Sequence, residues 1–166
     1  MISDADMSNE GRENMRAVIQ RVSSSSVVAE GNLTGTIGNG LMILLGVFKA
    51  DEKLDAELLA SKILKLRIFS DENGKMNKSV LDISGEALVV SNFTLCANYA
   101  HGNRPDYLEA EAPERAQELY EYFVSLLRKE IKAETGKFGA HMSLTIENDG
   151  PITIVMDSHV LRKKGK

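Results

Sequence analysis

The dipeptide Gly150-Pro151 constrains the fold of this chain more than any other short stretch, because it stands between two runs with strand patterns. Residues 142–147 alternate apolar and polar side chains, and residues 152–157 are β-branched and mostly apolar. Proline fixes its own φ, removes one backbone donor and tolerates a cis peptide bond, while glycine leaves backbone groups open to a ligand. Residues 148–151 are therefore predicted to form a tight connection, either a plain hairpin turn or a turn that faces a ligand.

A second short run, Ser91-Asn92-Phe93-Thr94-Leu95, follows an apolar strand predicted over residues 86–90. The strand is predicted to continue through this run to Leu95, so Ser91 and Phe93 point to one face of the sheet. Asn92 and Thr94 then point to the opposite face. The run thus places small hydroxyl and amide groups at the end of a buried strand.

The remaining pattern predicts strands, turns and two main helices. Apolar residues at helical spacing predict one helix over residues 54–66 and a second that begins at Pro113 and stops at Gly136. Most links between strands are too short for crossovers, so the expected fold class is α/β with largely antiparallel or mixed sheets. Further strands are expected at residues 16–26, 33–37, 41–48, 68–69 and 80–83, with turns at residues 30–32 and 72–75.

Groups that could hold a metal or act as a nucleophile are few. His101, His141 and His159 form no zinc-binding pattern with the single cysteine, so no metal and no cofactor are expected. Cys96 has no basic neighbour that would lower its pKa, and a packed or partly exposed thiol is expected instead of a nucleophile. Residues 96–112 lack a hydrophobic period, and a loop of that length in a compact domain suggests a function.

Length and composition predict one domain over residues 15–160, after a flexible extension of residues 1–14 and before a basic tail of residues 161–166. The 166 residues contain no apolar run near the length of a membrane span and no N-terminal hydrophobic segment, so neither a membrane partner nor a secretory signal is expected. A lone cysteine favours a reducing compartment, and the expected location is the cytoplasm.

The formal net charge of −4 argues against a protein that coats nucleic acid, and no DNA partner is expected. A protein that binds only the aminoacylated end of a tRNA needs a local basic patch and not a basic domain. Candidates for such a patch are Arg104, Lys137, Arg162, Lys163, Lys164 and Lys166.

The two short runs together resemble the signature motifs of the D-aminoacyl-tRNA deacylases. Ser91-Asn92-Phe93-Thr94-Leu95 and Asn148-Asp149-Gly150-Pro151-Ile152-Thr153 occur in the family's order, about 55 residues apart. The likeness extends to residues 15–22, 102–105 and 135–142, and in all it covers about residues 15–158. It implies the family's barrel-like fold and its activity, hydrolysis of the ester that joins a D-amino acid to tRNA.

The resemblance also implies how such a site works. The Gly150-Pro151 bond would be cis, and one subunit of a homodimer would insert it into the pocket of the other. Its backbone would hold the amino group of a D-aminoacyl ester and exclude an L side chain, so that D-aminoacyl-tRNA and glycyl-tRNA, including glycine mischarged on tRNA(Ala), are the expected substrates. Ser91 and Asn92 would bind the substrate, and Phe138, Gly139 and Met142 would line the wall near the terminal adenosine, whose 2′-hydroxyl would assist the attack.

Two mechanisms fit the first run. Thr94 would be the nucleophile in one, although threonine is weak without a base and none is evident nearby in the sequence. In the other, backbone amides of Phe93 and Thr94 form an oxyanion hole, each donor being worth about 3 to 4 kcal/mol in the transition state.

One position departs from the family pattern, because Asn92 stands where members usually carry glutamine. Its reach is about 1.5 Å shorter, so weaker activity or altered specificity is expected.

An alternative function of another class is nucleic-acid binding without turnover on the same fold. It predicts strong salt-dependent affinity for uncharged nucleic acid.

Overall fold

Strand β1 organises the sheet, because both of its edges are paired. In the computed structural model, which describes residues 13–163, β1 (Arg16–Ala29) pairs antiparallel with β8 (Met142–Asp157) along its full length. Its other edge is shared by β2 (Asn32–Ile37) and β3 (Gly40–Gly46), both antiparallel to it. A turn at residues 30–31, where Glu30 and Gly31 have positive φ, joins β1 to β2 as the sequence predicts.

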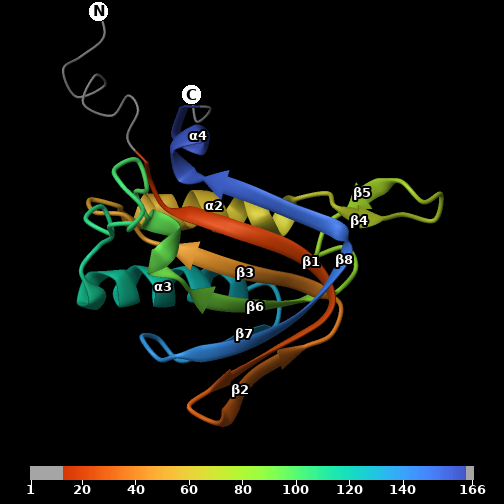
Figure 1. Ribbon diagram of the computed structural model, residues 1–166. Helices are drawn as coiled ribbons and strands as arrows, with labels where there is room; N and C mark the ends of the chain where they lie inside the picture. Colours follow the sequence, from red (N-terminus) through yellow and green to blue (C-terminus); the bar gives the residue numbers. More distant parts are fainter. Residues whose placement is uncertain (1–12, 164–166) are drawn as a thin grey trace, which may run out of the picture.

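Beyond β3 the sheet becomes parallel. β6 (Glu86–Ser91) pairs parallel with β3, and β7 (Ala133–Thr135) pairs parallel with β6. The order is β2-β1-β3-β6-β7, with β8 on the outside of β1, and β4 (Phe69–Ser70) and β5 (Met76–Lys78) form a separate hairpin that projects from the body (Figure 1). The sheet curls until a Cβ at Gly35 of β2 would lie 2.8 Å from the Thr135 carbonyl of β7. The mixed, barrel-like α/β fold is therefore confirmed.

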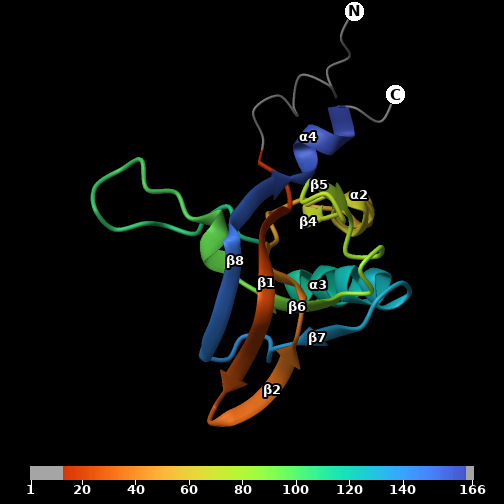
Figure 2. The ribbon, with the colours of Figure 1, turned by 90° about the vertical axis from the view of Figure 1, so that its right-hand side faces the viewer.

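Two long helices cover one face of this sheet (Figure 2). α2 (Lys53–Lys65) begins with a capping box between Glu52 and Asp55, and α3 (Pro113–Arg128) begins with proline in its first turn, as predicted. α4 (Ser158–Lys163) is a short helix that follows β8 directly. The apolar faces of α2 and α3 pack on the alternate side chains Leu41, Ile43 and Leu45 of β3, which are almost fully buried.

The two ends of the described chain meet at the start of α2. Asp55 is fully buried, and its carboxylate accepts two hydrogen bonds from Arg162, at 2.8 and 2.9 Å, and one from Ser158 at 2.7 Å. Asn14, which is 1% exposed, donates to Asp51 and Asp55 at 3.4 Å. Asn14 and Arg162 are thus parts of the folded domain, although the sequence patterns assign them to the extension and the tail. Residues 1–12 of the predicted extension lie outside the described residues, as do Lys164 and Lys166.

Three predicted elements are wrong in detail. Residues 80–83 form a turn instead of an extended stretch, because Ser79 and Asp82 exchange side-chain to backbone bonds of 2.8 and 3.2 Å. The second helix ends at Arg128 and not at Gly136, because residues 133–135 pair with β6 as β7. The strand predicted through residue 95 ends at Ser91, and a 3₁₀ helix, η1 (Phe93–Cys96), follows it.

Candidate active site

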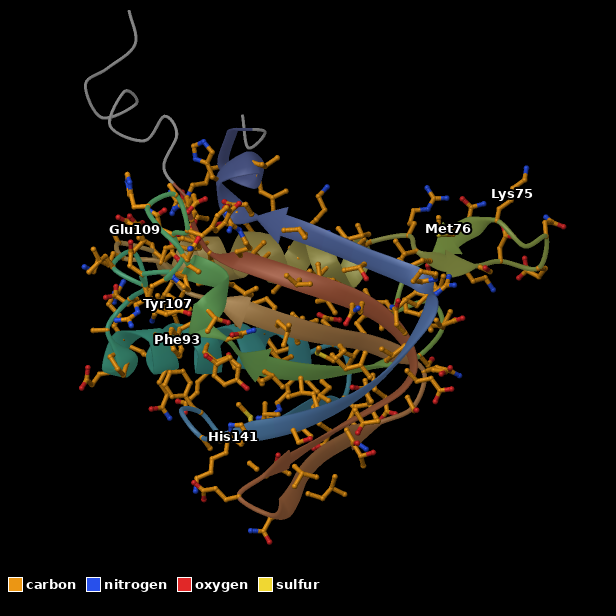
Figure 3. All side chains as sticks on the ribbon, in the orientation of Figure 1. Lys75, Met76, Phe93, Tyr107, Glu109 and His141 are labelled. Atoms are coloured by element: carbon orange, nitrogen blue, oxygen red, sulfur yellow. The ribbon has the colours of Figure 1, made fainter. Side chains whose placement is uncertain are left out.

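A cavity of about 840 Å³ lies where β3 and β6 end. Its walls come from η1, the loop that precedes α3, the first turns of α3 and the segment that leads into β8. Figure 3 shows Phe93, Tyr107 and His141 at this end of the molecule, opposite the hairpin that carries Lys75 and Met76. The lining is mainly apolar, with a few polar groups: Leu44, Val47, Val90, Ser91, Asn92, Phe93, Thr94, Tyr107, Ala110, Glu111, Ala112, Pro113, Ala116, Phe138, Gly139, Ala140, His141, Met142 and Leu144.

Most of the site residues predicted from the sequence line this one cavity. Both the first motif and the segment near residue 140 contribute to it, although more than 40 residues separate them in the chain. Gly150 and Pro151 do not belong to the lining. One chain therefore brings seven predicted residues together without the Gly-Pro pair. The seven are Ser91, Asn92, Phe93, Thr94, Phe138, Gly139 and Met142.

The chain turns sharply at Asn92, so the predicted alternation of faces over residues 91–94 is wrong. Asn92 is the N-cap of η1, and its side-chain oxygen accepts hydrogen bonds from the Thr94 amide, at 3.2 Å, and from the Thr94 hydroxyl. Its own amide donates to the Leu45 carbonyl at 2.8 Å, which ties the turn to β3. Asparagine suits this position because its short side chain reaches the amide two residues ahead. The shorter side chain is thus used inside the turn itself.

Among the described residues, the Thr94 hydroxyl makes no hydrogen bond to a base. Its hydrogen bond goes to an amide oxygen, which cannot take up its proton at neutral pH. A nucleophilic hydroxyl needs an adjacent base or a lowered pKa. The geometry therefore favours a backbone role for this turn, with the Phe93 amide at the first position of η1, where helical amides have no intrahelical partner.

Two aromatic contacts shape the cavity. Phe93 is 58% exposed, and its ring meets Tyr107 edge-on, with ring centroids 5.0 Å apart. Phe138, which also lines the cavity, packs against Tyr120, whose hydroxyl donates to the Val89 carbonyl at 2.7 Å. Burial raises the pKa of Tyr120, so this hydroxyl stays protonated and fixes the wall to β6.

Cys96 is a packed thiol, which is one of the two states that the sequence predicts. It is 1% exposed and donates to the Val47 carbonyl at 3.4 Å. Burial raises the pKa of the thiol to about 12, with a further contribution from Asp51. Because the thiolate is the reactive form, Cys96 carries no nucleophilic chemistry at neutral pH.

The Gly150-Pro151 pair lies within one continuous strand, so the predicted hairpin turn is wrong. β8 runs through both halves of the pattern against β1, with register shifts opposite residues 20–24. Extra residues on one strand form a bulge, which bends that strand sharply. The bond before Pro151 is cis, and Gly150 has φ +142°. Figure 1 shows the bend of β8 at the end of the sheet away from η1.

Arg21 and Asn148 hold the backbone of this bulge. Arg21 donates from Nε to the Asp149 carbonyl at 3.1 Å and from Nη1 to the Ile68 carbonyl at 2.8 Å. Asn148 donates to the carbonyls of Arg21 and Ile152 at 3.0 and 2.9 Å. These bonds to main-chain oxygens hold the bulge in place. They matter here because Pro151 has no backbone N–H to donate.

The predicted basic patch is partly neutralised. Lys137 forms an ion pair with Glu30 at 2.7 Å, and Arg162 is bound by Asp55. Arg104 lies exposed in the loop before α3. Among residues 13–163 no group of three or more His, Cys, Asp or Glu could hold a metal ion, and no helix there is long and apolar enough to span a membrane.

Comparison with known proteins identifies the family of this chain. A profile of the D-Tyr-tRNA(Tyr) deacylase family matches residues 18–157. A D-aminoacyl-tRNA deacylase of Thermosipho melanesiensis is 55% identical over 146 residues, which cover 87% of this chain and 97% of that protein. The chain belongs to the D-aminoacyl-tRNA deacylase family. The predicted membership is therefore confirmed.

Two solved structures are similar to this member of the deacylase family. The c-Myc DNA Unwinding Element Binding Protein shares 43% identity with a TM-score of 0.80, and the match covers 85% of this chain and 97% of that one. A probable eukaryotic D-amino acid tRNA deacylase shares 16% identity with a TM-score of 0.74, over 86% and 98% of the two chains. The second likeness shows the fold alone.

Sequence reasoning missed several side chains of this cavity, among them Tyr107 and Glu111. Tyr107 and Glu111 come from the loop before α3, which the sequence marks as functional by its length alone. A run without periodicity contains no signal for the direction of a side chain. Their places depend on backbone bonds to the end of β3, described below.

Proposed function

We propose that this chain removes D-amino acids from tRNA, and glycine mischarged on tRNA(Ala), while it spares L-aminoacyl-tRNA. Its class, a hydrolase of aminoacyl-tRNA esters, follows from its family. The observation that carries the finer proposal is the cavity at the end of β6. It gathers the first motif and the Phe138 wall in one chain, and it leaves the Gly150-Pro151 backbone outside.

The reaction needs little from side chains. Water, assisted by the 2′-hydroxyl of the terminal adenosine, attacks the ester carbonyl carbon, and the carbonyl oxygen becomes an oxyanion. The Phe93 amide donates to this oxygen. The bond from carbon to the ribose oxygen then breaks, the ribose oxygen takes a proton, and the products are a free amino acid and tRNA. The Thr94 amide could join as a second donor only after it leaves Asn92.

The chiral element of the proposal comes from a second copy of the chain. If both motifs act in one site, a partner must supply Gly150-Pro151, because the cavity of a single chain lacks them. β8 supports this arrangement, since no strand in residues 13–163 pairs with its outer edge over 16 residues. Val155 and Ile146 on β8 are 66% and 36% exposed. A long, partly apolar free edge is normally covered in solution, and a homodimer would cover it.

A backbone that holds the amino group distinguishes substrates only by the configuration at the α-carbon. The D side chain would point out of the cavity, while an L side chain would collide with main-chain atoms that cannot move aside. Glycine has no side chain to reject, which is why glycyl-tRNA is included. The buried, reduced thiol of Cys96 is compatible with a site of action in the cytoplasm.

The first test compares deacylation rates of D-tyrosyl-tRNA, L-tyrosyl-tRNA and glycyl-tRNA. Fast loss of the D and glycyl esters with the L ester spared is the expected result. Equal loss of the D and L esters would refute chiral exclusion and leave an unselective esterase.

The second test separates backbone from side-chain chemistry. Phe93→Pro removes the proposed donor at a first helical position, where proline is tolerated, and Phe93→Leu is the matched control that keeps the amide. We expect Phe93→Pro to lower kcat roughly 100- to 1,000-fold. Thr94→Ala keeps its amide and should retain most activity, whereas complete loss with a trapped acyl-threonine in the parent protein would establish the nucleophile mechanism.

The third test asks whether the site is shared between subunits. Phe93→Pro and Gly150→Ala chains are each expected to lose most of their activity when assayed alone. Randomly paired mixed dimers should recover about a quarter of the parent activity, because half of them carry one complete site of two. No recovery after co-refolding would place both motifs in one chain and refute the partner's role.

One comparison favours a second candidate function. The 43% identical c-Myc DNA Unwinding Element Binding Protein suggests that a chain of this fold can also bind DNA. Binding of uncharged duplex or single-stranded DNA at physiological salt tests this function. The net charge of −4 leads us to expect weak binding that vanishes as salt rises.

A further inference from the structure

Glu111 is the sole carboxylate among the cavity-lining residues that the structure describes. Its side chain is only 13% exposed. Leu44, Val47, Ala110 and Ala116 lie in the same lining and offer it no polar atoms on their side chains. A charged group in such a place loses hydration and needs compensating donors.

The backbone around Glu111 is held firmly. Its amide donates to the Val47 carbonyl at 3.0 Å, just beyond the end of β3, and the Lys49 amide donates to the Glu109 carbonyl at 2.8 Å. Phe48 and Ala110 form an antiparallel bridge between these two bonds. Residues 109–111 therefore lie along the chain that leaves the central sheet, and Glu111 takes its place in the wall from that pairing.

The carboxylate is only partly satisfied by the protein. Oε1 accepts the Ala112 amide at 2.9 Å, and Oε2 lies 3.5 Å from Nε of Arg115, which in turn donates from Nη2 to the Asp51 carbonyl at 2.9 Å. An ionised carboxylate has about four acceptor positions, so these two contacts leave room for further donors. Arg115 orients the group, and its own side chain is 47% exposed.

We propose that Glu111 is a specificity-determining residue, whose carboxylate accepts a hydrogen bond from an amino group of the aminoacyl-adenosine end of tRNA. The proposal rests on the deacylase activity above. Two groups of this substrate have the required chemistry, the α-ammonium group of the amino acid and the exocyclic amino group of adenine. Carboxylates accept strongly from cationic amines and also from amino groups of bases.

The test measures binding of three amide-linked, non-hydrolysable analogues by calorimetry. The first is D-tyrosyl-3′-amino-3′-deoxyadenosine, the second lacks its α-amino group, and the third carries purine in place of adenine. The variants are Glu111→Ala and the matched control Glu109→Gln, an exposed residue of the same loop that lies beyond Tyr107 as seen from His141 (Figure 3). Parent-protein turnover of D-tyrosyl-tRNA is measured first, so that failure of the deacylase proposal appears separately.

We expect Glu111→Ala to raise the Kd of the first analogue roughly ten- to a hundredfold, and Glu109→Gln to leave it unchanged. The effect of Glu111→Ala should disappear for the second analogue if the α-ammonium group is the partner, and for the third if adenine is. An unchanged Kd for the first analogue would overturn the proposal. An equal rise for all three, with a lowered Tm, would also overturn it, because the carboxylate would then only brace the start of α3.

Discussion

Arg162→Met tests how the described ends of the chain are held together. The substitution keeps an unbranched apolar stem and removes the guanidinium group that donates to Asp55 at 2.8 and 2.9 Å. Asp55 is fully buried, and the Arg162 side chain is 22% exposed. The variant would leave a buried carboxylate with the Ser158 hydroxyl, the Glu52 amide and Asn14 as its donors.

Breaking one side of a buried ion pair costs about 3 to 5 kcal/mol. The lower end applies here, since Asp55 keeps three donors and water can enter where Arg162 was. A loss of about 3 kcal/mol lowers the Tm of a domain of this size by roughly 6 to 12 °C.

The loss should depend on pH in a definite direction. Burial alone would raise the pKa of Asp55, but hydrogen bonds from Arg162, Glu52 and Ser158 outweigh it and lower that pKa below its ordinary value of 3.8. A carboxyl with a depressed pKa stabilises the fold above its unfolded pKa and ceases to do so as pH falls through its folded pKa. Without Arg162 the pKa of Asp55 rises. The difference in free energy of unfolding between the parent protein and the variant should therefore be largest at neutral pH and become smaller toward about pH 4.

Urea unfolding of both proteins at neutral and acid pH measures these quantities. Lys132→Met is the matched control, because it removes an exposed ion pair with Glu86 at 3.2 Å, and it should cause no resolvable loss. The reasoning would be refuted if Arg162→Met lost no more unfolding free energy than Lys132→Met, or if its loss stayed constant down to pH 4.

Three further predictions concern single positions. Gly150→Ala places a Cβ 2.7 Å from the Ile152 amide at φ +142°, so deacylation of D-tyrosyl-tRNA should fall roughly tenfold or more, whereas Gly74→Ala, at φ +77° in open space, should leave the rate unchanged. Cys96, with its raised pKa of about 12, should react with iodoacetamide only after unfolding, and fast labelling of the folded protein at neutral pH would contradict its burial. Phe123→Ala in the core should cost about 3 to 5 kcal/mol in urea unfolding, while Glu118→Ala on the exposed side of the same helix should cost little.

Local sequence patterns predicted the elements whose signals are local. The apolar spacing of α2 and α3, the proline at the start of α3 and the turn at residues 30–31 depend on neighbours within a few positions, and the structure agrees with them. The two signature motifs also led to the family, because side-chain identity at each place is itself the signal. The first motif lies in the cavity with the Phe138 segment, although the sequence offered no distance between them.

The tertiary structure decided what depends on pairing between distant segments. Residues 133–135 become a strand because β6 offers a free edge, and no local pattern shows that edge. The Gly150-Pro151 pair interrupts a single strand instead of turning it, because β1 is long enough to pair with both halves.

The sequence by itself thus determined the chemistry available to this chain: two motifs, buried apolar strands and no evident base. Only the tertiary structure decided where that chemistry lies. It turned Asn92 onto Thr94, brought Glu111 into the cavity wall through a bond to Val47, and kept Gly150-Pro151 outside the cavity of its own chain. The physical reason is that side-chain identity is local information, whereas strand register and backbone pairing join residues far apart in the chain.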